Sequence, residues 1–313
     1  MMPRVRAPFK WYGGKSYLVK HLLSLFPEHR TYIEPFCGSA VMLFAKTPAE
    51  VETINDLNGG VAGFFRVLRD HPDEFMRLAR LSEYSRELWY ECRDTWVTEG
   101  DPIRRAWKWW YVAATSFAGN WGSAWGTAVT KSYRGCVGTC SSHISLVDEV
   151  LPQCIERLRR VQVDCVDGLV ALRRYATEDG LAYVDPPYVG ETRAGDRYTH
   201  RRNPTGVDMP DVARHAELVS LLLETPGAVI VSGYAHPVYE PLESAGWRRI
   251  DWPTVCHAVA KTRHTGIQGD GAVTSAQRRV ESVWLNPECL RRLGRIPLLE
   301  EAVHDRDHSA VVG

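Results

Sequence analysis

Short apolar segments that end in an acidic or turn-forming residue alternate along this chain with segments of helical periodicity, and this alternation leaves few folds open to it. The apolar segments lie at Tyr32–Glu34, Val51–Asp56, Val161–Cys165, Leu181–Asp185, Ala228–Ser232 and Val280–Leu285. Helical patterns lie between several of them, at Val41–Lys46 and Asp211–Glu224 for example. Strands that alternate with helices form a parallel sheet with helices on both faces, and ligands bind beyond the carboxyl ends of such strands. We therefore predict an α/β fold of this kind.

The composition is that of a folded protein, with 44% hydrophobic and 24% charged residues in a chain of 313. No apolar run reaches the length of about 18 residues that a transmembrane helix needs. No apolar stretch follows the basic N-terminus, as a secretory signal would require. Eight cysteines at irregular spacing fit a reducing compartment. We therefore expect a cytoplasmic protein without membrane contact.

The alternation is interrupted between residues 57 and 160. This stretch has the pattern of several helices followed by a Gly/Ser-rich segment, Gly119–Ser142, and it holds seven of the eleven tryptophans. So many large apolar rings predict an insertion with its own core. We expect a discontinuous main domain over residues 1–60 and 161–298, a mainly helical insertion over 61–160, and a flexible acidic tail over 299–313.

The strongest local signal for function is Asp185-Pro186-Pro187-Tyr188, which directly follows the apolar segment Leu181–Val184. A carboxylate at the end of a buried strand lies where α/β sheets bind their ligands. The two prolines remove two backbone donors and fix the chain, which leaves carbonyl oxygens as acceptors. The motif can therefore present a carboxylate and a carbonyl to one amino group, with the Tyr188 ring available to stack. Alone it also fits a rigid turn.

Two earlier strands end in residues suited to binding a small ligand. The first continues into Glu34-Pro35-Phe36-Cys37-Gly38-Ser39-Ala40, where small residues let a ligand approach the backbone and a helix N-terminus. The second ends in Asn55-Asp56, about 20 residues further on, where an acidic side chain is placed to accept hydrogen bonds from ribose hydroxyls. Neither segment is a Gly-x-Gly-x-x-Gly dinucleotide fingerprint.

The N-terminal segment Phe9-Lys10-Trp11-Tyr12-Gly13-Gly14-Lys15-Ser16 invites interpretation as a phosphate-binding loop. A Walker loop needs a glycine where Phe9 stands and a buried strand before it, and this chain has neither. Two aromatic rings, two glycines and a lysine can instead form a cap over a small ligand, with a cation for its carboxylate.

With FKWYGGK, YIEPFCGSA, INDLN and YVDPPY in this order, the chain resembles the Dam-like DNA adenine-N6 methyltransferases. The resemblance covers the start of the chain and the region around YVDPPY. It implies a Rossmann-like methyltransferase fold, S-adenosylmethionine as the methyl donor, double-stranded DNA as the substrate, and a target-recognition insertion between the donor-binding half and YVDPPY. The tryptophan-rich stretch falls in that place. Ala40 departs from the pattern, because many members have a glycine there.

The resemblance also implies a role for each motif residue. Trp11 and Lys15 would contact the donor, with Lys15 near its carboxylate, and Asp56 would hold the ribose hydroxyls. The floor under the methionine moiety would be formed by the segment from Glu34 to Gly38, Phe36 included. The target base would be held by Asp185, Pro186, Pro187 and Tyr188: the carboxylate and the Pro186 carbonyl bind the adenine amino group, and the tyrosine stacks. Asp185 would also border the donor.

Three basic clusters favour a polyanionic partner. Residues 1–27 carry five basic side chains and no acidic one, residues 257–280 carry four against one, and residues 191–202 carry four against two. From these clusters we expect DNA contacts by Lys10, Arg201 and Lys261, and Lys10 also matches a family position that reaches DNA. The whole chain has 38 basic and 38 acidic residues, which argues against a protein that coats nucleic acid.

The insertion predicts relaxed sequence recognition. Between Lys108 and Lys131 it contains no lysine or arginine, so the bidentate arginine contact that most often specifies guanine is unavailable there. Trp121 and Trp125 can stack or wedge where a base is flipped out, which helps extrusion but reads sequence poorly. We expect a short or relaxed recognition sequence rather than GATC.

Alternatives remain open at this point. Cytosine-N4 methylation uses the same chemistry, although those enzymes more often begin the tetrad with serine. A catalytically inactive DNA-binding relative and a protein-glutamine methyltransferase, which usually has asparagine at the position of Asp185, are the others. Cys136, Cys140 and His143 lack the second tight pair of a zinc site, so we expect no metal. No obligatory protein partner is evident.

Overall fold

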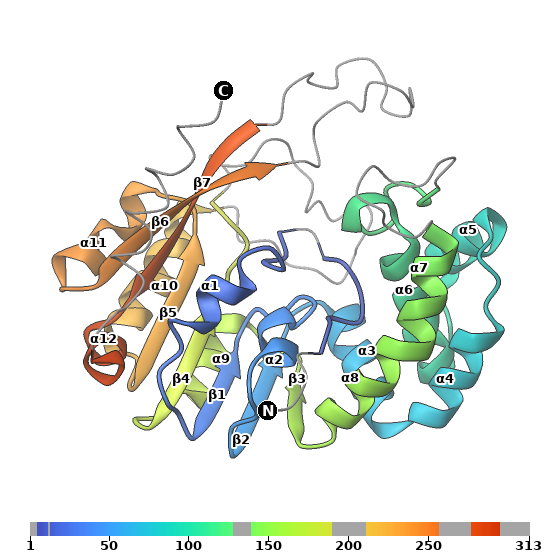
Figure 1. The fold of residues 1–313 in the computed structure, drawn as a ribbon, viewed down its shortest axis with the longest axis horizontal. Coiled ribbons are helices and arrows are strands. Elements are labelled where there is room, and N and C mark those ends of the chain that lie inside the picture. The colour runs from blue at the N-terminus through green and yellow to red at the C-terminus, as the bar shows by residue number, and fades with distance from the viewer. Residues whose placement is uncertain (1–4, 12, 128–138, 190–210, 257–276, 295–313) are drawn as a thin grey trace, which may run out of the picture.

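The structure is a computed structural model that describes residues 5–11, 13–127, 139–189, 211–256 and 277–294. Seven strands form one sheet in the order β3-β2-β1-β4-β5-β7-β6 (Figure 1). The strands are β1 (Thr31–Glu34), β2 (Val51–Asn55), β3 (Val161–Asp164), β4 (Gly180–Val184), β5 (Ala228–Gly233), β6 (Arg248–Cys256) and β7 (Gln277–Leu285). The six predicted strands are all present, with ends shifted by three residues at most.

Five strands are parallel and two are not. β3, β2, β1, β4 and β5 pair in parallel, whereas β7 pairs antiparallel with both β5 and β6. The expectation of a parallel sheet is therefore wrong for β6 and β7. β6 was not predicted as a strand at all. It lies at the edge of the sheet and pairs on one side only, so it does not need the continuous apolar run of an interior strand.

Helices cover both faces of the sheet, as predicted (Figure 1). One face packs against α1 (Val19–Leu23), α2 (Val41–Ala45) and α12 (Pro287–Leu293). The other packs against α9 (Gly168–Tyr175), α10 (Val212–Glu224) and α11 (Glu240–Ser244). Alternate residues of β4 show the division, because Tyr183 belongs to the first core and Val184 to the second. The fold is therefore of the α/β, Rossmann-like type.

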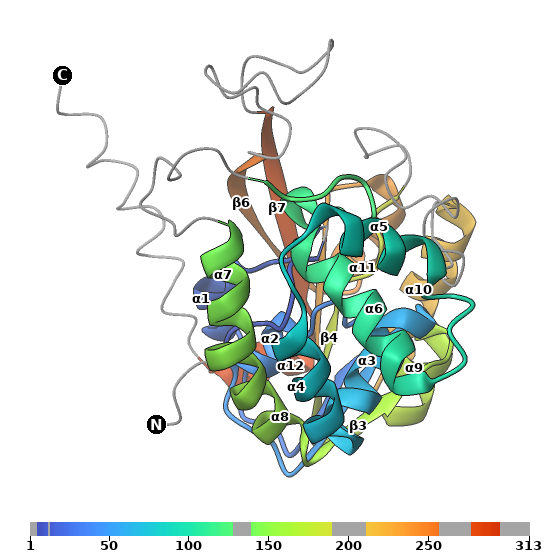
Figure 2. The ribbon, with the colours of Figure 1, turned by 90° about the vertical axis from the view of Figure 1, so that its right-hand side faces the viewer.

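The described chain between β2 and β3 is helical (Figure 2). Its elements are α3 (Gly59–Asp70), α4 (Pro72–Leu81), α5 (Arg86–Thr95), α6 (Pro102–Thr115), a 3-10 turn η1 (Phe117–Gly119), α7 (Thr139–Ser145), a π-helical turn η2 (Leu146–Val150) and α8 (Leu151–Leu158). Side-chain oxygens of Asn58, Ser85 and Asp101 cap the N-termini of α3, α5 and α6. The capping explains why these helices begin where they do.

The prediction of a separate core for this helical stretch is wrong. Six of its seven tryptophans are buried and Trp125 is half-buried, but they pack in one continuous core with the face of the sheet that α1 and α2 cover. Phe9 makes the connection: its ring lies 5.4 Å from that of Phe64 in α3 and 5.3 Å from that of Trp109 in α6. α3 begins only four residues after β2 ends, so it cannot lie far from the sheet.

The N-terminal segment 5–11 runs between the sheet and these helices. The Val5 amide donates to the carbonyl oxygen of Phe44 at the end of α2 (3.1 Å). The indole of Trp110 donates to the carbonyl oxygen of Pro8 (3.0 Å), and the Cys154 thiol of α8 lies 3.3 Å from that of Arg6. The segment therefore ties α2, α6 and α8 together.

Candidate active site

Three of the four sequence motifs meet at one edge of the sheet. β1 lies between β2 and β4, and all three strands run in the same direction. The residues that follow them, Pro35–Ala40, Asp56 and Asp185, are therefore neighbours at the carboxyl edge, where α/β folds bind ligands. The fourth motif, from Phe9 to Lys15, reaches both sides of this edge.

Asp56 links the turn after β1 to the start of α3. One carboxylate oxygen accepts the Gly38 amide and the other accepts the Asn58 amide, both at 2.9 Å. Burial raises the pKa of Asp56 to about 6, against the two amide hydrogen bonds that lower it. Each oxygen has a second lone pair, so the carboxylate can still accept two hydroxyl donors.

Asn55, which the sequence analysis passed over, fixes the same edge. Its side-chain amide donates to the carbonyl oxygens of Pro35 (2.8 Å) and Val166 (3.0 Å), and its oxygen accepts the Val166 amide (2.9 Å). The fully buried side chain therefore joins the ends of β1, β2 and β3. Its position at the end of a predicted strand, directly before an acidic residue, is the feature of the sequence that could have identified it.

Trp11 packs directly onto Gly38. Gly38 has a φ of +49°, and a Cβ atom added there would lie 2.6 Å from Cδ1 of Trp11. The indole is held from behind by the rings of Phe9 (5.9 Å) and Trp109 (5.8 Å). Two residues that were predicted to bind the donor are thus in contact, and only glycine fits beneath the ring.

Glu34 supports the turn rather than facing outward. Its Oε1 accepts the Tyr32 hydroxyl (2.9 Å) and the Leu43 amide in the first turn of α2 (2.7 Å). The residue preceding α2 is Ala40, which has a left-handed φ of 51° and no side chain that can cap the helix. Burial raises the pKa of Glu34 to about 8. The ring of Phe36 lies against Gly168 at the start of α9.

Lys15 lies against Asp185. Its ammonium donates to both carboxylate oxygens, at 2.7 and 3.0 Å, and to the carbonyl oxygen of Gly13 (3.3 Å). Only 1% of Lys15 is exposed. Burial alone would lower the pKa of Lys15, but Asp185 and Glu281 raise it well above its ordinary value. The contact of Lys15 with a donor carboxylate stays a prediction, because its ammonium pairs with Asp185 in this structure.

Glu281 on β7 completes the cluster and was not predicted from the sequence. It is buried, and its Oε1 lies 3.3 Å from the Lys15 ammonium. The Tyr188 hydroxyl donates to Glu281 and accepts from Lys15. Burial raises the pKa of Asp185 to about 6, with Lys15 lowering it and Glu281 raising it.

The residues predicted to contact DNA are only partly described. Lys10 is exposed, and a Cβ atom added to Gly119 would lie 3.0 Å from its Cβ, so it borders the turn after α6. Trp125 is half-buried beneath the guanidinium of Arg86, 5.3 Å from its ring centre. Arg201 and Lys261 lie outside the described residues.

Trp121 is packed in the structure, and its predicted contact with a flipped base stays a prediction. Only 8% of the residue is exposed, and its ring stacks on that of Trp109 at 6.4 Å and 22°. Its indole donates to the Trp109 carbonyl oxygen (3.1 Å). The ring is therefore part of the common core.

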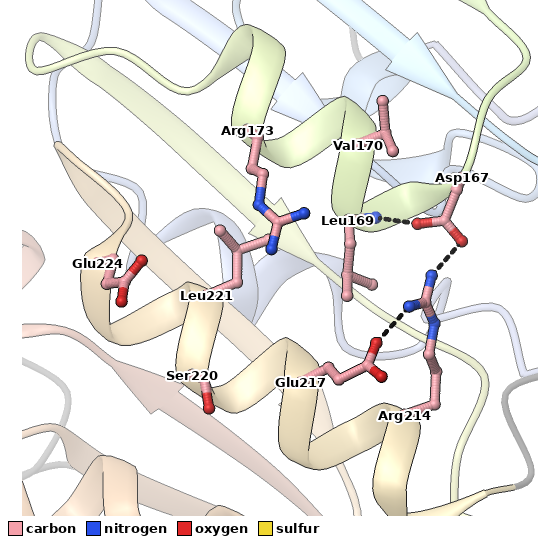
Figure 3. Close-up of a pocket in the computed structure, with 9 residues that line it drawn as sticks. All are labelled: Asp167, Leu169, Val170, Arg173, Arg214, Glu217, Ser220, Leu221 and Glu224. Atoms are coloured by element: carbon pink, nitrogen blue, oxygen red, sulfur yellow. Dashed lines mark hydrogen bonds and ion pairs between the residues drawn. The ribbon is translucent and has the colours of Figure 1, made fainter.

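Other features of the described residues add no catalytic group. A groove of about 560 Å³ between α9 and α10 (Figure 3) is lined by none of the motif residues, and Arg214 pairs there with Asp167 and Glu217. His143 lies among the rings of Tyr84, Trp110 and Tyr111, and burial lowers its pKa to about 4.

No group of three or more metal-binding side chains occurs in the part of the chain that the structure describes. None of the helices described there is long and apolar enough to span a bilayer.

Comparison with known proteins identifies the family. The family model of the D12 class N6 adenine-specific DNA methyltransferases matches residues 11–205. A Type II methyltransferase, M1.LlaDCHI of Lactococcus lactis subsp. cremoris, is 27% identical over 247 residues, which are 75% of this chain and 84% of that protein. A DNA adenine methylase of Vibrio cholerae is 24% identical over 241 residues, 74% of this chain and 83% of that protein. The DNA adenine methylase of Escherichia coli K12 is 28% identical over 109 residues, 34% of this chain and 39% of that protein.

These matches favour adenine N6 over cytosine N4 as the methylated atom, and they cover the Trp11, Gly38, Asp56 and Asp185 positions whose geometry is described above. The resemblance drawn from four short motifs is confirmed. The chain belongs to the D12 class of N6 adenine-specific DNA methyltransferases.

Proposed function

We propose that this adenine-N6 methyltransferase uses S-adenosylmethionine as its donor, acts on double-stranded DNA in the cytoplasm, and uses Asp185 as its catalytic carboxylate. The observation that carries the proposal is the arrangement of two half-sites on adjoining strands. Trp11, Gly38 and Asp56 form one half-site, and Lys15 and Asp185 form the other. The segment from Trp11 to Lys15 belongs to both, so the donor and the base are held by one continuous piece of chain.

The first half-site has the features that the donor requires. Asp56 retains two acceptor positions for ribose hydroxyls, and the Trp11 ring lies directly on the Gly38 turn, where it can contact a donor bound at this edge of the sheet. Glu34 and Phe36 hold the turn in shape from below. When bound, S-adenosylmethionine supplies an electrophilic methyl group on a positively charged sulfur.

Asp185 then acts on the adenine amino group. The N6 lone pair is delocalised into the ring, which makes N6 a poor nucleophile. A carboxylate and the Pro186 carbonyl that each accept one N6–H bond localise the lone pair on N6, and Asp185 is placed to receive the proton that N6 must lose on methylation. Lys15 holds the carboxylate in place, and the pKa of Asp185, about 6, keeps it mostly ionised at neutral pH. Positioning of the reactants is worth roughly 7–11 kcal/mol in such reactions.

N6 is out of reach inside a stacked duplex, so the base must flip out, at a cost of a few kcal/mol. We propose that the helical stretch over residues 61–160 recognises the target, and that residues 1–60 and 161–298 form the catalytic domain. Phosphate contacts by Lys10, Arg201 and Lys261 would supply affinity. The stretch without lysine or arginine before Lys131 supports a short or relaxed recognition sequence.

The test is single-turnover methylation of duplex DNA, with N6-methyladenine measured by mass spectrometry. Asp185→Ala should lower the rate by about a hundredfold or more, as the loss of a group that stabilises the transition state does. Asp179→Ala is the matched control, because Asp179 is an exposed carboxylate at the other end of the same strand, and its rate should equal the wild-type rate. Retention of more than about a tenth of the rate by Asp185→Ala would sink the assignment. A wild-type protein that binds DNA without making N6-methyladenine would be an inactive relative.

A further inference from the structure

Glu281 is a buried carboxylate outside all four motifs, yet it contacts two of their residues. It belongs to β7, where it opposes Trp252 of β6, and 1% of it is exposed. One oxygen lies 3.3 Å from the Lys15 ammonium and accepts the Tyr188 hydroxyl. The other accepts the Tyr17 hydroxyl at 3.3 Å. An acid is rarely buried unless its charge is used or paired.

The described side chains of this cluster carry more negative than positive charge. Two carboxylates, Asp185 and Glu281, share one cation, Lys15, so the three side chains carry a net charge of −1 when ionised. A simple structural ion pair would have matched charges. Within the described part of the chain, the net negative charge of these three side chains lies beside the edge of the sheet where a sulfonium donor and the base are proposed to meet, and it favours a positively charged ligand there.

The contacts of Glu281 and Lys15 also hold the ring of Tyr188, which is predicted to stack on the target base. The Tyr188 hydroxyl is bound between Glu281 and Lys15, and the Lys15 ammonium lies 4.7 Å from the centre of the Tyr188 ring. The ring of Tyr234 packs on its side at 4.3 Å. Removing Glu281 would take away the acceptor of the Tyr188 hydroxyl, while the contact of that hydroxyl with Lys15 would remain.

We propose that Glu281 is a positioning residue of the methyltransferase site, which shares Lys15 with Asp185 and anchors the hydroxyl of Tyr188. This inference rests on the proposed function of Asp185. Glu281 touches neither base nor donor in this scheme. It sets the charge of the site and the distance between the carboxylate and the stacking ring.

Glu281 raises the pKa of Asp185 and Lys15 lowers it, so the direction of the pKa change in each variant can be tested. Removing Glu281 should lower the pKa of Asp185, and removing Lys15 should raise it further above its ordinary value. Among the residues that the structure describes, the other titratable groups around the carboxylate are tyrosines and one acid that these substitutions leave in place: Tyr17, Tyr183, Tyr188, Tyr239 and Glu34.

The experiment compares Glu281→Gln, Lys15→Met and Asp251→Asn in the full-length protein. Asp251 is the matched control, because it is a carboxylate of the same hairpin that opposes Ser282, one position along β7, and accepts its hydroxyl. Carbon-13 NMR of labelled aspartate carboxyls measures the pKa of Asp185, whose signal is identified from its loss in Asp185→Asn. Single-turnover methylation over a range of pH gives the rate.

Glu281→Gln should lower the pKa of Asp185 and so shift the acid limb of the rate profile to lower pH. It should also reduce the rate at neutral pH by about 10- to 100-fold, because misplacing a reacting group by 1 Å costs about a hundredfold. Lys15→Met should shift the pKa the other way, and Asp251→Asn should change neither quantity. Glu281→Asp keeps the charge but shortens the side chain, so the pKa should stay close to that of the wild type while the rate falls.

An unchanged pKa of Asp185 in Glu281→Gln, or an equal change in Asp251→Asn, would overturn the inference. If Glu281→Gln does not fold, Glu281→Asp decides the same question, because a wild-type rate in that variant would overturn the inference. If the wild type makes no N6-methyladenine, the proposed function fails, and the NMR titration still decides whether Glu281 controls Asp185.

Discussion

Replacing Gly38 by alanine tests whether the half-site beneath Trp11 is built as described. Two separate costs are expected. The backbone at Gly38 is left-handed, with a φ of +49°, and an L-residue pays about 1–2 kcal/mol for this conformation. The added Cβ would also lie 2.6 Å from Cδ1 of Trp11 and 3.1 Å from its Nε1, so the indole must move.

The indole has little room to move, because the rings of Phe9 and Trp109 pack on it. Overpacking of this kind costs about 1–3 kcal/mol. Together with the backbone cost, we expect Gly38→Ala to lower the free energy of unfolding by about 2–5 kcal/mol. It should also weaken donor binding, since Trp11 shifts and the Gly38 amide that Asp56 accepts shifts with it.

Urea unfolding followed by tryptophan fluorescence measures the stability, and calorimetry measures the affinity for S-adenosylmethionine. Two controls add or remove one methyl group in other surroundings. Gly63→Ala makes the same change in the middle of α3, with nothing within 4 Å of the new methyl group, and should raise stability by about 0.5–1 kcal/mol. Ala40→Gly makes the reverse change in the same turn: it relieves a left-handed alanine but removes a buried methyl group, so stability should stay within about 1 kcal/mol of the wild type. If Gly38→Ala were as stable as the wild type and bound donor equally well, the contact between Trp11 and the turn would be wrong.

Three further outcomes follow from the same geometry. Asp56→Ala should weaken donor binding by about 1.5–3 kcal/mol, the value of a hydrogen bond to a charged group, and unchanged affinity in calorimetry would place the donor elsewhere. The pKa of Glu34 is raised from 4.5 to about 8, so between these pH values the folded state keeps a proton that the unfolded chain loses. The protonated Glu34 therefore contributes to the free energy of unfolding in full below pH 4.5, and this contribution falls by about 1.4 kcal/mol per pH unit as the pH rises to 8. Glu34→Gln should lack this part of the slope in urea unfolding at pH 5 and 8, and equal slopes would contradict the assignment. Methylome mapping should find N6-methyladenine outside GATC, and modification confined to GATC would show that other residues read the DNA.

The parts of the fold that repeat a local pattern could be predicted from the sequence. β4 is an unbroken apolar run before Asp185, and every residue of it is buried. Local chemistry also marked Asp56 and Gly38, because an acid at a strand end and a glycine in a tight turn have few other uses. β6 could not be recognised, since an edge strand with Arg248, Arg249 and Asp251 has no apolar run of its own.

What escaped prediction depends on partners far away in the chain. Lys15 was assigned to a ligand because nothing near it in sequence is acidic, but its partners are 170 and 266 residues away. Glu281 was invisible for the same reason: its burial comes from Lys15 and Tyr188, not from its neighbours on β7. The packing of Trp121 was not predicted either, because its hydrogen-bond and stacking partner, Trp109, lies in α6 on the far side of a turn.

The position of the N-terminal segment has a consequence for the order in which the molecule can be completed during synthesis. Residues 5–11 leave the ribosome before their partners Trp110 and Cys154, which follow about a hundred residues or more later. Lys15 must then wait for Asp185 and, near the end of the described chain, for Glu281. Until β7 is made, this lysine has no complete set of partners and stays hydrated. A nascent chain can therefore fold its helices and its first strands early, yet the cluster of Lys15, Asp185 and Glu281 is complete only after β7 has been translated.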